Sequence, residues 1–124
     1  MDLSCALSLK SGQEFVPLEM PPDTISLNGD GPLILAFDFY VWMKEARKAV
    51  PEIEMNYSFS LKGNGAVLTR GLGRAIADQK GRVLLSFDVP ASKTLLELEA
   101  EIAYVGIKPI EDAEFSLDIP VEKT

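Results

Sequence analysis

Asp38 is the carboxylate in this sequence whose setting comes closest to that of a catalytic acid. It lies inside the apolar run of residues 33–41, and burial of a carboxyl group raises its pKa towards the range that proton transfer requires. A glycosidase would need a second carboxylate that faces it across a sugar-sized cleft, and no residue of the sequence pairs with Asp38 in this way. The interpretation that we favour is a hydrogen-bonded aspartate within a β-strand.

The remaining chemistry of the chain is limited by what it lacks. It contains no histidine, the usual metal ligand and general base near neutral pH, so triads built on histidine are excluded. Cys5 is the only cysteine, which rules out a disulfide within the chain and favours a reducing compartment. The glycine-containing segments 63–65 and 71–73 lack the third glycine of a phosphate-binding loop. We therefore predict a non-enzymatic protein without a metal or a nucleotide cofactor.

Tyr40 and Trp42 form a candidate ligand-binding pair. On an extended strand, residues two positions apart point to the same face, and exposed aromatic rings on a β-sandwich can stack on sugars. The competing interpretation is core packing, since Trp42 is the only tryptophan and adjoins a candidate helix. A small-ligand or carbohydrate-binding domain is accordingly the alternative function.

Charge and hydropathy narrow the choice of partner and compartment. Twelve basic residues against nineteen acidic ones give a net charge of −7. A field of this sign repels phosphate backbones and anionic lipids, so we expect no nucleic-acid partner and no membrane insertion. No N-terminal stretch resembles a signal peptide, and no apolar run approaches the roughly twenty residues of a membrane span. These features predict a cytoplasmic location.

Alternation of apolar and polar residues is the dominant pattern of the chain, and a period of two predicts strands with one buried face. It is clearest in residues 53–61. The other predicted strands are residues 3–9, 33–41, 83–89, 94–105 and 115–121. Of the eight prolines, only Pro120 falls inside such a run, which predicts that the last strand ends there or lies at a sheet edge.

The fold class that follows is all-β. Seven or so short strands separated by turn residues predict one antiparallel β-sandwich domain over residues 1–124, immunoglobulin-like or jelly-roll-like. Residues 42–50 (WMKEARKAV) contain good helix formers and stop before Pro51, so we predict one short helical segment there.

Residues 53–89 predict a three-stranded antiparallel meander with turns at Asn64 and Gly81. If each loop has three residues, Tyr57 lies opposite Gly71 and Glu54 lies opposite Arg74. Large residues of the outer strands then cover small ones of the middle strand, and aromatic rings over strand glycines fill the gap. A two-residue first loop would shift this register.

The opposite face of the middle strand is the candidate interface. A solvated face should be polar, whereas this one alternates apolar side chains with arginine, as binding surfaces do. Its predicted residues are Leu68, Arg70, Leu72, Arg74, Ile76 and Leu84. Burial of this face beneath residues 42–50 is the alternative that stays open. The predicted function is a protein–protein interaction or structural module, whose partner is another protein or a second copy that offers acids such as Glu97, Glu99 and Glu101.

Overall fold

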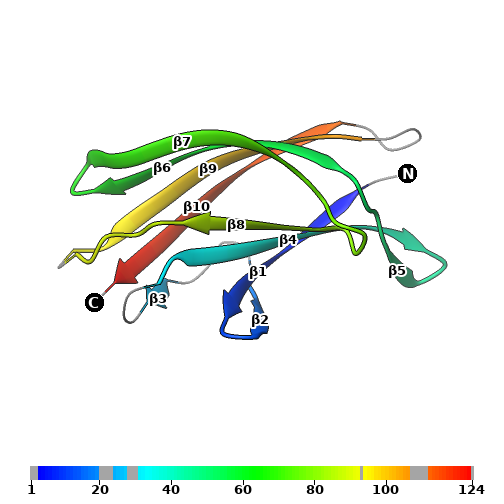
Figure 1. Ribbon diagram of the computed structural model, residues 1–124, viewed down its shortest axis with the longest axis horizontal. Coiled ribbons are helices and arrows are strands. Elements are labelled where there is room, and N and C mark those ends of the chain that lie inside the picture. Colours follow the sequence, from blue (N-terminus) through cyan, green and yellow to red (C-terminus); the bar gives the residue numbers. More distant parts are fainter. Residues whose placement is uncertain (1–2, 20–23, 28–30, 93, 107–111, 124) are drawn as a thin grey trace.

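The computed structural model describes residues 3–19, 24–27, 31–92, 94–106 and 112–123, and all secondary structure within these ranges is β (Figure 1). The strands are β1 (Ser4–Ser11), β2 (Glu14–Pro17), β3 (Ile25–Leu27), β4 (Leu33–Met43), β5 (Ala46–Ala49), β6 (Glu54–Gly63), β7 (Ala66–Ile76), β8 (Arg82–Phe87), β9 (Leu96–Val105) and β10 (Ala113–Lys123). They form two sheets that lie one over the other. The all-β prediction is confirmed.

Over the part of the chain that the structure describes, each of the two sheets contains five strands. In sheet A the order is β2-β1-β4-β5, and β8 also pairs with β4. In sheet B the order is β3-β10-β9-β6-β7, so β7 is the terminal strand on one side. The pairs are antiparallel except for β3 with β10, which is parallel.

The core lies between the sheets and follows the alternation of the sequence. On β4, Leu33, Leu35 and Phe37 are at most 1% exposed, and each such side chain stabilises the fold by about 1.5–3 kcal/mol when fully buried. β9 shows the same alternation of buried and more exposed positions, which confirms the predicted strand there. Glutamates on one face and apolar residues on the other suit a sheet that covers a core.

Pro120 lies inside β10, so the predicted alternative that the strand ends there is wrong, whereas the predicted sheet edge is correct at this position. The structure pairs Pro120 with Glu97 of β9, whereas the pairing of β10 with β3 starts only at Val121. At this position β10 therefore has a strand on one side alone, which is where a residue without a backbone N–H is tolerated.

The helix predicted at residues 42–50 is wrong. β4 continues to Met43, a two-residue turn at Lys44 and Glu45 follows, and β5 pairs back onto β4. Both turn residues have positive φ, 50° and 70°, which is the conformation that a two-residue hairpin turn requires. Asn-Gly usually marks such a turn, so Lys-Glu gave no indication of it. Pairing with β4 outweighed the local helix propensity.

The predicted meander is correct only for its first hairpin. β6 and β7 are antiparallel neighbours, but after β7 the chain crosses to the other sheet, where β8 pairs with β4. The turn at Gly81 is present, and the Asp78 carboxylate accepts hydrogen bonds from the amides of Lys80 and Arg82 at 2.8 and 3.0 Å. The alternation of apolar and polar residues could not predict which sheet β8 joins, because a strand of either sheet buries one face against the same core.

The register of the β6–β7 hairpin differs by two residues from the prediction. A two-residue turn and a bulge beside Leu61 pair Phe59 with Gly71 and Tyr57 with Gly73. A Cβ atom at Gly71 would lie 2.8 Å from Cε1 of Phe59, and one at Gly73 would lie 2.5 Å from the Tyr57 hydroxyl oxygen. The predicted cover of aromatic rings over strand glycines is therefore present, with shifted partners.

Candidate functional site

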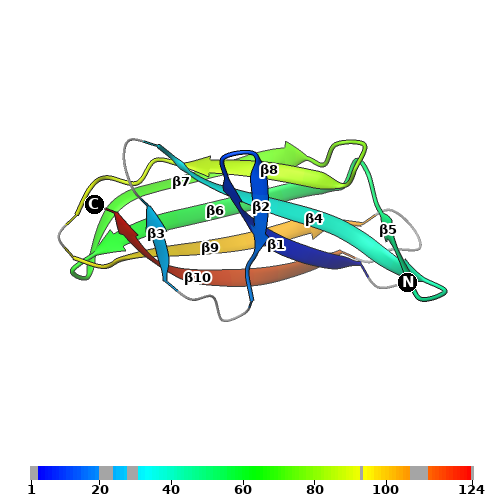
Figure 2. The same ribbon diagram turned by 90° about the horizontal axis from the view of Figure 1, so that it is seen from below.

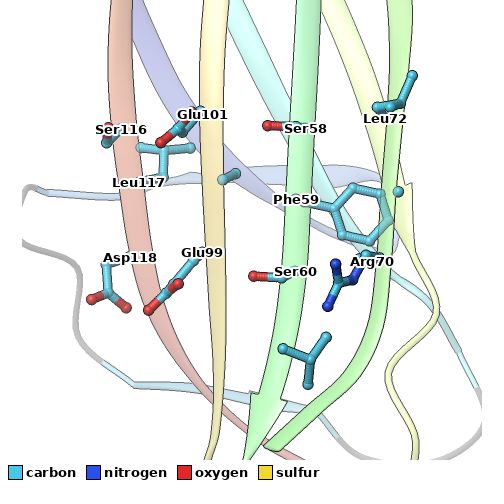
Figure 3. A pocket seen from close by; sticks show the side chains of 13 residues that line it. Ser58, Phe59, Ser60, Arg70, Leu72, Glu99, Glu101, Ser116, Leu117 and Asp118 are labelled. Carbon is cyan, nitrogen blue, oxygen red and sulfur yellow. The ribbon is translucent and has the colours of Figure 1, made fainter.

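The outward side chains of β7, β6, β9 and β10 form an uncovered face of sheet B. The cross-strand register sets them in rows: Arg70–Ser60–Glu99–Asp118, then Leu72–Ser58–Glu101–Ser116, then Arg74–Asn56–Ala103–Glu114. Small serines on β6 separate long side chains on β7 from those on β9 (Figure 3). The result is a shallow, open trough of about 880 Å³. Serine hydroxyls, which both donate and accept hydrogen bonds, line its centre beside apolar residues such as Leu72.

Charge is segregated across this face. Its basic side chains, Lys62, Arg70 and Arg74, lie on β6 and β7. Its acidic side chains lie on β9 and β10, with one further acid on β6: Glu97, Glu99, Glu101, Glu114, Asp118, Glu122 and Glu54. The face is thus basic along one margin and acidic along the other. Such an arrangement gives a partner a defined orientation.

Two ion pairs between described residues lie on the face. The Lys62 ammonium nitrogen is 2.9 Å from a carboxylate oxygen of Glu99. The Arg74 guanidinium is 3.1 Å from a carboxylate oxygen of Glu54. Glu54 was predicted to lie directly opposite Arg74, but its cross-strand partner is Ile76, so the pair is diagonal. Both pairs are open to solvent, where such contacts contribute little to stability.

The carboxylates of Glu97, Glu99 and Asp118 each place an oxygen within 4.8 Å of the others. A hydrogen bond with Asp118 and the repulsion between the two charges raise the pKa of Glu97 above its ordinary value. Oxygen ligands of this kind suit hard cations, but the Lys62 ammonium already supplies a cation at Glu99. No second feature of the described residues indicates a bound ion here.

Four of the six predicted interface residues share the face. Arg70, Leu72, Arg74 and Ile76 point outward from β7, and Leu72 is 85% exposed. Residues 42–50 do not cover them, since β5 lies in sheet A. The open alternative of burial beneath that segment is therefore wrong.

Leu68 and Leu84 lie elsewhere. The β6–β7 bulge turns Leu68 towards the core side of Gly63, where an added Cβ would meet Leu68 at 3.2 Å and buried Leu96 at 2.8 Å. Leu84 belongs to β8 in sheet A. The bulge brings Val67 onto the face instead, opposite Lys62. The sequence did not predict this residue, because a bulge reverses the alternation without a characteristic residue.

Tyr40 and Trp42 lie together on the outer face of sheet A. Their ring centroids are 5.8 Å apart in an edge-to-face arrangement, and the Arg47 guanidinium lies 3.8 Å above the Tyr40 ring. Trp42 is 57% exposed, so the core-packing interpretation is wrong for it. Because Arg47 covers one face of Tyr40, the indole of Trp42 is the more accessible stacking surface of the pair.

Asp38 is a paired strand residue. Arg82 lies opposite it in the sheet and donates two hydrogen bonds to its carboxylate, at 2.6 and 3.1 Å. This contact raises the pKa of the Arg82 guanidinium, and the Phe15 ring covers the guanidinium at 3.9 Å. Both carboxylate oxygens accept hydrogen bonds, which confirms the favoured interpretation of Asp38.

Cys5 is a weak candidate for a nucleophile. Burial, and to a smaller extent the charge of Asp38, raises the pKa of its thiol to about 12. The thiolate is the reactive form of cysteine, and at neutral pH this group stays protonated. Its side chain packs against the core, so its role is that of a small apolar residue.

The chain matches no protein-family model, and no curated protein matches its sequence. Among the described residues, no helix has the length and hydropathy that crossing a bilayer requires.

Proposed function

We propose that the protein is a non-enzymatic protein-binding module whose partner docks on the outer face of sheet B along β7. The observation that carries this proposal is Leu72, which is 85% exposed between Arg70 and Arg74 on the terminal strand. Burying such a side chain yields about 1.5–3 kcal/mol. Arginine is enriched in interface cores and can lay its stem along apolar surface.

The length of β7 supports the same proposal. β2, β3, β5 and β8, which also lie at sheet margins, have four, three, four and six residues, whereas β7 has eleven. Proteins protect edge strands by keeping them short or by placing lysine or proline on them. β7 contains neither residue. β7 does carry two arginines, Arg70 and Arg74, and a bulge interrupts its pairing with β6, so it is the length of this terminal strand that suits a surface covered by a partner.

The chemistry of the described residues favours binding over catalysis. The strongest candidate acid, Asp38, is held by Arg82, and the thiol of Cys5 is protonated at neutral pH. We further propose that the sandwich is immunoglobulin-like. In this assignment β1, β4 and β8 take the places of strands A, B and E, and β6, β7, β9 and β10 those of C, C′, F and G. A cytoplasmic location stays a prediction from composition.

A pair of variants tests the proposed surface. Leu72→Glu places a charge on the sheet B face, and Leu84→Glu makes the same change on β8, where the leucine is 49% exposed. In cells of the natural source, the tagged wild-type chain should retain a partner or an untagged copy of itself. Leu72→Glu should lose it, and Leu84→Glu should keep it. Equal retention by both variants, with melting curves that show folded proteins, would contradict the proposal.

A small-ligand site at Tyr40 and Trp42 is the second candidate, favoured by the exposed indole beside Arg47. Because Trp42 is the only tryptophan of the chain, tryptophan fluorescence, excited selectively over tyrosine, reports on this site alone. Titration with a panel of oligosaccharides should shift or quench the emission if sugars stack there. Unchanged spectra over the whole panel, up to millimolar concentrations, would remove carbohydrate binding from consideration.

A further inference from the structure

We infer that the partner is a second copy of this chain, packed face to face through sheet B about a two-fold axis parallel to the strands. The inference rests on the proposed function, since it names the occupant of the same surface. What carries it is the placement of charge in columns, basic on β6 and β7 and acidic on β9 and β10.

The register determines which side chains would meet. An axis that runs between β6 and β9 places β7 of one copy over β10 of the second copy, and β6 over β9. Each cross-strand row of one copy then lies over the same row of the second copy, with its residues in the reverse order. Arg70 faces Asp118 of the second copy, and Arg74 faces its Glu114. By symmetry each contact occurs twice, as in any isologous interface.

At the centre of the face, the residues of each row meet those of the same row of the second copy in the same way. Lys62 faces Glu97 of the second copy, because the two residues occupy one row. Ser60 and Ser58 face Glu99 and Glu101 of the second copy, so serine hydroxyls can donate to carboxylates. The small serine side chains leave room for the longer glutamates of the opposing copy, which suits the trough seen along β6 (Figure 3).

Other pairings of two copies lack this complementarity. A two-fold axis in the face but perpendicular to the strands places β7 over β7, and arginine over arginine. Edge-to-edge pairing of β7 with β7 brings no acid opposite Arg70 or Arg74, because β7 contains no Asp or Glu. Like charges placed opposite each other are unfavourable. The arrangement parallel to the strands is the one in which each basic side chain of the face meets an acid.

The area of the face is sufficient for a specific dimer. Four strands of ten or eleven residues span about 34 Å by about 19 Å, or roughly 650 Å², at the usual rise and spacing of a sheet. Stable interfaces bury about 800 Å² per partner. The projecting side chains add surface area to the value calculated for a flat sheet. Acids outnumber bases on the face, so we expect a dimer of moderate affinity that depends strongly on its arginines.

Charge-swapped variants of the full chain test the pairing. The first carries Arg70→Glu and Arg74→Glu, and the second carries Glu114→Arg and Asp118→Arg. In sedimentation velocity over a concentration series, the wild type should dimerise, and each variant alone should associate at least about ten-fold more weakly. Mixed together, the two variants should form a heterodimer, because both of its margins are again complementary. Arg47→Glu with Lys48→Glu on β5 is the control, which should dimerise like the wild type.

The outcomes separate this inference from the proposed function. A wild type that stays monomeric throughout, a dimer that both variants retain, or folded variants that do not associate when mixed would each overturn the inference. If a different protein is then retained in a manner that depends on Leu72, the proposed function stands. If Leu72→Glu affects the retention of no protein, including a second copy, the proposed function fails as well.

Discussion

The outer faces of the two sheets differ in how far the chain itself covers them. On sheet A, the β1–β2 hairpin lies over the strands (Figure 2), and Phe15 of β2 stacks on Arg82. Ala36, which points away from the core, is nevertheless 0% exposed. On sheet B nothing within the described residues covers the outward side chains, and Leu72 is 85% exposed.

The two faces also differ in the geometry and the solvent exposure of their ion pairs. On sheet A, Asp38 and Arg82 lie directly opposite each other, make two hydrogen bonds and are covered by an aromatic ring. On sheet B, Arg74 and Glu54 meet diagonally through a single close contact, in solvent. Breaking a covered pair is costly, because the charge that remains loses its partner, whereas an exposed pair contributes little to stability and its charges stay available to another molecule. The difference indicates that sheet A is covered by the chain itself around Asp38 and Arg82, although Trp42 and Leu84 stay exposed elsewhere on it, whereas the outer face of sheet B has no such cover among the described residues.

The largest effect is expected from Asp38→Ala on the covered face. This change leaves the Arg82 guanidinium, whose side chain is 30% exposed, beneath Phe15 without its partner. Removing one member of a part-buried, hydrogen-bonded pair should lower the free energy of unfolding by about 2 kcal/mol. Chemical denaturation at pH 7 measures this change in the free energy of unfolding. If the free energy of unfolding falls by no more than it does when an exposed pair is removed, the ion pair on sheet A is no more important to the fold than the one on sheet B.

Arg74→Ala is the matched change on the open face and should have a much smaller effect on stability. The side chains of Arg74 and Glu54 are 63% and 37% exposed, and exposed pairs contribute about 0.5 kcal/mol or less. Denaturation curves of the variant should nearly overlay those of the wild type, while its dimer should weaken in sedimentation. A large loss of stability without a change in association would assign Arg74 to the fold and not to an interface.

The sequence predicted the parts of this comparison that depend on burial alone. Alternation identified the long strands and β8 but not the short strands β2, β3 and β5. It placed Arg70, Leu72 and Ile76 on one outward face, because a strand has only two sides. It did not predict that β8 crosses to sheet A, since either sheet satisfies its pattern. The bulge that removes Leu68 from the face depends on backbone geometry, as does the positive-φ turn at Lys44. Neither has a residue preference that this sequence displays.

The acidic margin of the site could not be predicted for a different reason. Glu99 and Glu101 alternate outward from their own strand, and the sequence indicates this much. That β9 lies beside β6, so that these acids share a face with the arginines, is a matter of strand order. Contacts between strands far apart in sequence are determined by tertiary packing, on which local pattern carries no information.

The smallest effect is expected from Glu97→Gln, which removes one of the three clustered carboxylates on the open face. The hydrogen bond with Asp118, and then the repulsion between the two charges, raise the pKa of Glu97 above its ordinary value of 4.5, so the ionised form is less favourable in the folded state than in the unfolded chain. The penalty is fully present above the raised pKa. It disappears as the pH falls through that pKa towards 4.5, because Glu97 then carries a proton. The variant should therefore melt at a slightly higher temperature than the wild type at pH 7, and the difference should vanish on acidification.

A gain that persists unchanged at pH 4 would arise from something other than this charge. A lower melting temperature at pH 7 would show that Lys62, 2.9 Å from Glu99, stabilises the ionised cluster more than its own repulsion destabilises it.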